Sequence, residues 1–301
     1  MIVQKKLIVT GAHGFVAGSV LGQAGAEWQV HAVSRSQPAV KCGGFRWHVI
    51  DGAGQWAELF NQVRPDAVIH TAALADIDFC ETHPAEARSA NVELTRIIAG
   101  FCAEVGTKFV LCSTDTIFNG EQAPYVEQNS PAPINHYAKT KVEAEEIAAG
   151  LGSHAVIARL ALVVGLPVLG AGNSFLARML ATFREGREIP LSQKEVRTPV
   201  DVLTVGQALL ELAQEDHRGI FHLSGNERLN RFEIGQQIAA GFGFSKNLVV
   251  PQTMEATPGR AIRPRDVSLD NSKARANLKT PMRNFDEGLA LILKNAGMRT
   301  P

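Results

Sequence analysis

Residues 5–18 read KKLIVTGAHGFVAG, and this stretch decides the fold. Its first six residues are a short apolar run behind two lysines, which is typical of a buried strand. Gly11, Gly14 and Ala17 follow at the spacing G-x-x-G-x-x-A and open a helix. A strand, a glycine turn and a helix N-terminus in this order bring backbone N–H groups to a pyrophosphate. The stretch therefore predicts the first unit of a dinucleotide-binding sheet, with a glycine-rich turn that binds no ligand as the alternative.

Strand-like and helix-like patterns alternate along the chain, which predicts a Rossmann-type α/β fold, a doubly wound parallel sheet covered on both faces. Apolar runs predict six strands at 5–10, 29–34, 46–51, 67–71, 108–113 and 155–160, and a long helix at about 84–105. Further helical patterns at 173–185, 201–214, 231–243 and 285–294 alternate with pieces rich in glycine and proline. We expect a dinucleotide-binding domain over 1–158, to which 197–224 returns. A smaller substrate-binding portion is expected over 159–196 and 225–301.

The end of the second predicted strand indicates which dinucleotide binds. An Asp or Glu there holds the ribose hydroxyls of NAD, whereas an Arg accommodates the 2′-phosphate of NADP. Here the strand ends in Ser34, Arg35 and Ser36, and no acidic residue occurs between Glu27 and Asp51. A guanidinium also matches the geometry of a phosphate. The sequence therefore favours NADP(H) over NAD(H), with a solvated surface role for Arg35 as the alternative.

Tyr137 and Lys141 are spaced as an acid/base pair. Residues four apart on a helix share a face, so the ammonium is expected to lie beneath the phenol and act on its proton. Lowering the pKa of a phenol from about 10 to about 7 requires about 4 kcal/mol. One ammonium about 4 Å away, at an effective dielectric near 20, supplies that amount. The alternative is a buried phenol with a satisfied hydroxyl.

Several motifs occur in the order of one enzyme family. They are Thr10-Gly11-x-x-Gly14, Asp51 after the third strand, His70-x-Ala72-Ala73, Asn91, Ser113-Thr114-Asp115 and Tyr137-x-x-x-Lys141. In this the chain resembles the extended short-chain dehydrogenase/reductase family. The block from 113 to 145, and Arg263-Pro264 near the end, are similar to its dTDP-4-dehydrorhamnose reductase branch.

The resemblance implies roles for single residues. Tyr137 would protonate the substrate carbonyl oxygen as hydride arrives, Thr114 would hydrogen-bond the same oxygen, and Lys141 would lower the phenol pKa and hold the nicotinamide ribose. Asp51 would reach the adenine amine or, alternatively, cap the next helix. The loop after the fourth strand would pass along the cofactor. The expected cofactor-binding set is Gly11, His13, Gly14, Phe15, Val16, Ser34, Arg35, Asp51, Thr71, Ala72, Ala73, Tyr137 and Lys141.

The expected substrate pocket is where the chain departs from that branch. Thr116 stands where an aromatic residue is common, and 160–165 lack a Trp-containing pattern. We expect Asp76, Asp78, Thr116 and Arg263 to bind substrate in a cleft between the two portions. A nucleotide diphosphate would suit the guanidinium groups of Arg178, Arg197, Arg263 and Arg265, with ordinary surface charges as the alternative.

The resemblance implies an NADPH-dependent reductase of a ketone, with a nucleotide-linked 4-keto-deoxysugar as substrate. Two alternatives stay open: a sugar epimerase or dehydratase that regenerates its cofactor, and a non-catalytic NADP-binding regulatory subunit. A dehydratase needs acid/base carboxylates beside the hydroxyl partner, and Asp115-Thr116 offers one. The sequence identifies neither the sugar nor its nucleotide.

Composition narrows the class of partner. Lys plus Arg and Asp plus Glu both total 30, so no net field attracts nucleic acid or an anionic membrane. Cys42, Cys80, Cys102 and Cys112 have no C-x-x-C spacing, and no apolar stretch is long enough to cross a bilayer, so we expect reduced thiols and a cytoplasmic location. The histidines include no H-x-x-x-H pair, and no metal site is expected. The oligomeric state, a homodimer included, stays open.

Overall fold

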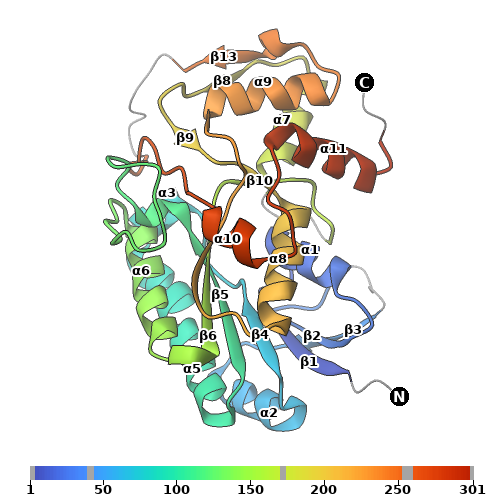
Figure 1. The fold of residues 1–301 in the computed structure, drawn as a ribbon, viewed down its shortest axis with the longest axis vertical. Coiled ribbons are helices and arrows are strands. Elements are labelled where there is room, and N and C mark those ends of the chain that lie inside the picture. The colour runs from blue at the N-terminus through green and yellow to red at the C-terminus, as the bar shows by residue number, and fades with distance from the viewer. Residues whose placement is uncertain (1–3, 39–43, 170–173, 253–259, 299–301) are drawn as a thin grey trace.

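The computed structural model describes residues 4–38, 44–169, 174–252 and 260–298 (Figure 1). Cys42 lies outside these residues. A parallel seven-stranded sheet forms the lower half of the view, and helices cover it on both faces. None of the described helices combines the length and the apolar character needed to cross a membrane.

The strand order of the sheet is β11-β6-β5-β4-β1-β2-β3, and every neighbouring pair is parallel. The strands are β1 (Lys5–Thr10), β2 (Trp28–Ser34), β3 (Phe45–Val49), β4 (Ala67–His70), β5 (Lys108–Thr114), β6 (Ala155–Leu160) and β11 (Gly219–Leu223). Six of them lie where the sequence predicts strands. The seventh, β11, was missing from that prediction and pairs with β6 at the edge of the sheet. It lies within 197–224, the segment expected to return to the sheet.

Both faces of the sheet are apolar because successive side chains of a strand point to opposite faces. Leu7 and Val9 pack with α1 (Phe15–Gln23) and α8 (Val202–Gln214) on one face. Ile8 packs on the other face with α2 (Ala53–Val63), α5 (Leu94–Val105) and α6 (His136–Ala149). The predicted helix at 84–105 consists of α4 (Pro84–Arg88), a π-helical turn (Ser89–Glu93) and α5.

A third apolar cluster lies among the helices of the upper part of the molecule, which Figure 1 shows as a ribbon. It is built on α7 (Phe175–Arg184), α9 (Arg231–Gly241) and α11 (Phe285–Asn295), close to three of the predicted helices. Short strand pairs connect these helices: β7 (Val163–Val164) with β10 (Val200–Asp201), β8 (Ile189–Leu191) with β13 (Val249–Pro251), and β9 (Val196–Arg197) with β12 (Leu229–Asn230). The boundaries between the two expected portions stay a prediction.

The remaining elements are short and connect these layers. They are α3 (Ile77–Thr82), α10 (Ser272–Asn277) and three 3-10 turns at Asp115–Ile117, Gly152–His154 and Lys246–Leu248. The first of these turns follows β5 directly and contacts β9 through the ion pair of Asp115 with Arg197. The carboxyl end of β5 therefore meets the upper part of the molecule, and parallel α/β sheets bind their ligands at this edge.

Candidate active site

The glycine turn and the loop after β4 lie against each other. Gly11 has a φ of 69°, and a Cβ atom there would lie 2.7 Å from the Cα of Ala72. The Thr71 hydroxyl donates to the carbonyl of Thr10 at 2.6 Å, and the Ala72 N–H donates to the Thr10 hydroxyl at 3.2 Å. Gly14 is the N-cap of α1 and has no side chain in front of the first N–H groups of the helix. Only glycine fits at position 11, and the turn keeps the helix N-terminus open to an anion.

The residues after β2 gather beside this turn. His13 lies with its Nε2 3.1 Å from the carbonyl oxygen of Ser36, and its ring is 4.9 Å from that of Trp47. The Trp47 indole N–H donates to the Ser34 hydroxyl at 3.0 Å. Arg35 is exposed. These side chains therefore gather near the carboxyl end of β2, the expected place of the adenosine ribose, and their contact with a cofactor stays a prediction.

Asp51 does not cap the helix that follows it. The N-cap of α2 is Gly52, and Gln55 accepts from the backbone N–H groups of both Asp51 and Gly52. The carboxylate of Asp51 is exposed. The capping alternative is thus wrong, and a contact with adenine stays a prediction.

Tyr137 and Lys141 share the buried face of α6, but their electrostatics differ from the prediction. Burial, and next the charge of Asp115, raise the pKa of Tyr137, while the nearby Thr114 hydroxyl acts the other way. The Lys141 ammonium donates to the carbonyl of Cys112 at 2.7 Å, and burial lowers its pKa. The expected lowering of the phenol pKa is therefore absent, because burial and a carboxylate raise it while the ammonium is engaged by the Cys112 carbonyl. The phenol is fully protonated near neutral pH.

The end of β5 places two hydroxyls and a carboxyl next to this phenol. The Thr114 hydroxyl accepts from the Thr116 N–H at 3.2 Å and lies 3.1 Å from the Thr116 hydroxyl. Asp115 is buried, and burial raises its pKa to about 6. From the sequence, Asp115 was considered only as the single carboxylate available to a dehydratase, and it was not among the expected site residues. Its position after Thr114 was the available signal, but its burial depends on the fold.

Asn91 ties the loop after β4 to α6. Its side-chain oxygen accepts from the Leu74 N–H at 2.7 Å, and its amide donates to the Thr140 hydroxyl at 2.9 Å. This contact fixes the loop expected to run along the cofactor against the helix that carries Tyr137.

Two of the expected substrate residues bind each other. Arg263 donates to both oxygens of Asp78, at 2.6 and 2.8 Å. The neighbouring Ile262 carbonyl accepts from Asn135, the N-cap of α6, at 3.1 Å. Asp76 caps α3 by accepting from the backbone N–H of residue 79 at 3.0 Å. The segment around Arg263 is thus fixed beside the start of α6, and its guanidinium is already paired.

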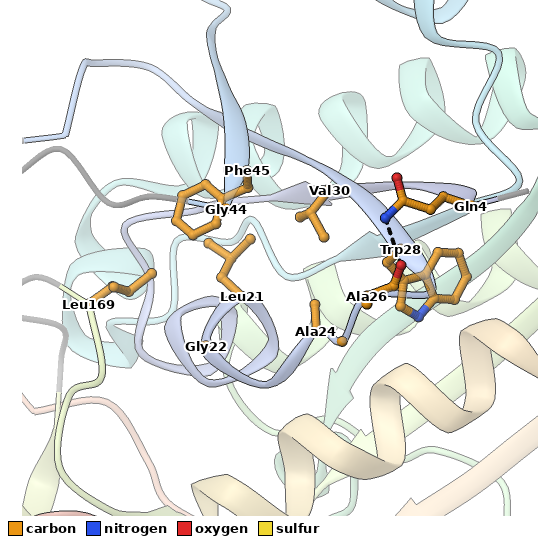
Figure 2. A pocket seen from close by; sticks show the side chains of 11 residues that line it. Gln4, Leu21, Gly22, Ala24, Ala26, Trp28, Val30, Gly44, Phe45 and Leu169 are labelled. Atoms are coloured by element: carbon orange, nitrogen blue, oxygen red, sulfur yellow. Dashed lines mark hydrogen bonds between the residues drawn. The ribbon is translucent and has the colours of Figure 1, made fainter. Parts of the chain in front are cut away.

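A crevice elsewhere in the molecule contains none of the predicted site residues. It has a volume of about 420 Å³ and lies between α1 and β2, with Leu21, Trp28 and Val30 in its lining (Figure 2). Gln4 before β1, Trp28 at the start of β2 and Phe45 at the start of β3 also line it, so it lies at the amino ends of these strands, whereas the polar groups named above follow the carboxyl ends of β1, β2, β4 and β5. The crevice is therefore not the candidate active site.

A family model described as the RmlD substrate binding domain matches residues 5–298. The chain belongs to this family. It is 29% identical over 294 residues to the probable low-salt glycan biosynthesis reductase Agl14 of Haloferax volcanii, over 94% of this chain and 96% of that protein. It is 28% identical over 278 residues to the methionine adenosyltransferase 2 subunit beta of Xenopus laevis, over 89% of this chain and 81% of that protein.

A solved dTDP-4-dehydrorhamnose reductase of Bacillus anthracis, in complex with NADP, has the same fold. Its TM-score is 0.86 at 24% sequence identity, and the match covers 97% of this chain and 100% of that chain. The predicted family, the α/β fold class and the oxidoreductase class are confirmed by these relatives.

Arg231 is a buried arginine of this RmlD-family chain that was not among the expected site residues. Its guanidinium stacks on the ring of Phe175, 4.1 Å from the centroid, and burial together with the charge of Arg197 lowers its pKa to about 10. Arg197, one of the expected arginines, donates to the Val196 carbonyl at 2.7 Å, whereas Arg265 is exposed. Arg231 is the first residue of a predicted helix, where a charged side chain is usually exposed, so the sequence did not indicate that it is buried.

A buried ion pair supports α6 from behind. Glu145 accepts from Arg159 of β6 at 3.1, 3.2 and 2.8 Å, and both side chains are almost completely buried. Glu145 lies one helical turn after Lys141 on the same face. The pair therefore fixes the helix that carries the candidate acid/base residues against the sheet.

Proposed function

We propose that the protein is an NADPH-dependent reductase of a ketone, with a nucleotide-linked 4-keto-deoxysugar as substrate. The observation that carries this proposal is the cluster of Tyr137, Thr114 and Lys141 at the carboxyl end of β5. The first two side chains have 8% and 9% of their surface exposed, and the third 3%. Hydroxyl groups in such a dry site polarise a carbonyl more strongly than they would in water.

The residues of the glycine turn fit a dinucleotide, because the backbone of Gly11 packs where no Cβ atom has room and α1 opens at Gly14. NADPH bound there would supply a hydride to the carbonyl carbon of the substrate. His13, Phe15, Val16, Thr71, Ala72, Ala73 and Asp51 are the other proposed cofactor contacts. Arg35 and Ser34 would receive the 2′-phosphate, which favours NADP(H) over NAD(H).

The proton would come from Tyr137. A raised pKa keeps the phenol protonated, so it has a proton for the developing alkoxide. The Thr114 hydroxyl would stabilise the same oxygen. Lys141, whose ammonium donates to the carbonyl of Cys112, would orient the ribose. Its positive charge would also stabilise the phenolate that remains after proton transfer.

The nucleotide-sugar part of the proposal rests on the relatives and on the residues around the site. Thr116 lies beside the Thr114 hydroxyl, and the pair of Asp78 with Arg263 lies beside the start of α6. With Asp76 they are the proposed substrate contacts. Arg263 would act through the segment it fixes, since its guanidinium is engaged by Asp78.

The test is oxidation of NADPH, followed by absorbance, with dTDP- and UDP-linked 4-ketosugars and simple ketones. Tyr137→Phe should abolish turnover and leave the affinity for NADPH nearly unchanged, whereas Lys141→Ala should reduce both. Tyr125→Phe is the control, because the Tyr125 hydroxyl accepts from the backbone N–H of 120, 121 and 122 in a loop. Retention of more than a few per cent of the rate in Tyr137→Phe would exclude the phenol as proton donor.

Two other outcomes would point to the alternatives. Stoichiometric bound nicotinamide that is regenerated, without net oxidation of NADPH, would indicate an epimerase or dehydratase. Tight binding of NADPH with no turnover of any ketone would indicate a regulatory subunit, an alternative that the similarity to a methionine adenosyltransferase subunit favours.

A further inference from the structure

One oxygen of the buried carboxyl of Asp115 has no hydrogen-bond donor. The side chain is 4% exposed, and its Oδ1 lies 3.3 Å from the Thr114 hydroxyl. Its Oδ2 receives no hydrogen bond from any residue in the described parts of the chain. Buried polar atoms of native proteins nearly always have a hydrogen-bond partner, because without one the free-energy cost of removing them from water is not compensated. The lone oxygen therefore indicates a missing donor.

Arg197 balances the charge of Asp115 but does not supply that donor. Its Nε lies 3.8 Å from Oδ2, which is longer than a hydrogen bond. The guanidinium is held by backbone carbonyls, at 2.7 Å from that of Val196 and 3.4 Å from that of Pro264. Arg197 is thus fixed at a distance that leaves Oδ2 available as an acceptor.

The lone oxygen belongs to the reacting end of the proposed site. Asp115 begins the 3-10 turn that packs against α6, the helix of Tyr137, and after burial its charge is the largest cause that raises the pKa of that phenol. The Thr114 hydroxyl contacts Asp115 directly. A ligand that displaced the cover of Tyr137 and Thr114 would therefore lie close to Asp115, whose own side chain is as deeply buried.

A carboxylate accepts hydrogen bonds and repels anions. A ketone whose oxygen contacted Thr114 and Tyr137 would bring the carbon next to its carbonyl close to Asp115, the residue that follows Thr114. We propose that Oδ2 of Asp115 accepts a hydrogen bond from a hydroxyl on that carbon, so that Asp115 selects α-hydroxy ketones. Analogues that lack this hydroxyl leave the oxygen unpaired, and 2-keto acids place a like charge beside it. This inference rests on the proposed reductase function and names the substrate feature that the site recognises.

The test compares dTDP-4-keto-6-deoxyglucose with its 3-deoxy analogue, which differ in one hydroxyl next to the carbonyl. The ratio of their kcat/KM values is measured in the unmutated protein, in Asp115→Ala and in Asp115→Asn. Because intrinsic reactivity is the same for every variant, only the change in the ratio matters. The preference for the hydroxylated sugar should fall about 10- to 100-fold in Asp115→Ala, the range for a hydrogen bond to a charged group. Asp115→Asn keeps a neutral acceptor and should lose less.

Asp201→Asn is the matched control. Asp201 is as buried as Asp115, but its oxygens accept from the Thr204 N–H at 2.8 Å and the Thr204 hydroxyl at 2.6 Å, as the cap of α8. The ratio of the kcat/KM values for the two sugars should be the same in Asp201→Asn as in the unmutated protein.

Calorimetric affinities of the two sugars for the protein with bound NADP⁺ give the same ratio where turnover is slow or a variant is inactive. An unchanged ratio in Asp115→Ala, in kinetics or in binding, overturns the inference and leaves the reductase proposal intact. No turnover of these sugars or of any other ketone in the panel by the unmutated protein refutes the reductase proposal, and the binding ratio then decides the role of Asp115 by itself.

Discussion

Asp115→Asn should change how the stability of the protein depends on pH. Burial raises the pKa of Asp115 from 3.8 to about 6. The folded state therefore holds this proton more tightly than the unfolded state does. The group favours folding fully below about pH 4, and this contribution is lost as the pH rises through 6. At 1.36 kcal/mol for each tenfold change in proton affinity, the whole effect is about 3 kcal/mol.

Asparagine is neutral throughout, so the variant should gain on the unmutated protein as the pH rises. About 2 kcal/mol of the gain falls between pH 4.5 and 7.5. Urea unfolding followed by circular dichroism, on both proteins at several pH values, measures it. Groups such as Asp78 and Asp266, whose pKa values are lowered, titrate in both proteins and cancel in the difference. The variant also loses the attraction between Asp115 and Arg197, but the pKa of about 6 already includes this attraction, so the predicted difference does not change. A difference that stays constant over this range would show that the carboxyl is not buried as described.

Three further changes test the site and its support. Gly11→Ala should weaken NADPH binding at least about 10-fold by calorimetry, because the new Cβ would lie 2.7 Å from the Cα of Ala72 at a φ of 69°, a conformation that costs other residues about 1–3 kcal/mol. Glu145→Gln should lower the free energy of unfolding by about 3–5 kcal/mol, because it leaves the buried charge of Arg159 without its partner; a loss below about 1 kcal/mol would contradict that. Arg35→Ala should reduce the preference for NADPH over NADH by about 1–3 kcal/mol, and equal affinities in the unmutated protein would remove the argument.

The sequence predicts the sheet well where burial on both faces makes a strand continuously apolar. Leu7, Ile8 and Val9 are such a case, and they pack on opposite faces as expected. It fails at β11, where a buried histidine, His222, stands in a five-residue strand. That ring is accommodated by the carbonyl of Asp270, 3.1 Å from its Nδ1, a residue far along the chain. The order of apolar and polar residues within β11 cannot reveal that the carbonyl of Asp270 lies beside this histidine.

The site shows the same division between local and distant causes. Helical spacing places Tyr137 and Lys141 on one face, and they lie there. The direction of the phenol pKa was predicted wrongly, since it depends on how deeply α6 is buried and on Asp115. Arg263 was expected to face a phosphate, but its guanidinium is paired with Asp78, 185 positions away. The sequence shows that Asp78 and Arg263 are both present, but only the fold brings them into contact.

The buried face of α6 joins the proposed chemistry to the stability of the fold. Tyr137, Lys141 and Glu145 follow one another at intervals of four, so their side chains leave the helix in one direction. Lys141 binds the carbonyl of Cys112 on β5, and Glu145 binds Arg159 on β6. Hydrogen bonds to two neighbouring strands prevent the helix from sliding or rotating, which apolar contacts alone would permit. The phenol is therefore positioned by bonds made one and two turns away from it, whereas its pKa is raised by burial and next by the charge of Asp115 at the end of β5. Changes at Glu145 should accordingly act on folding through the pair with Arg159, whereas changes at Asp115, which is paired with Arg197, should also act on substrate choice.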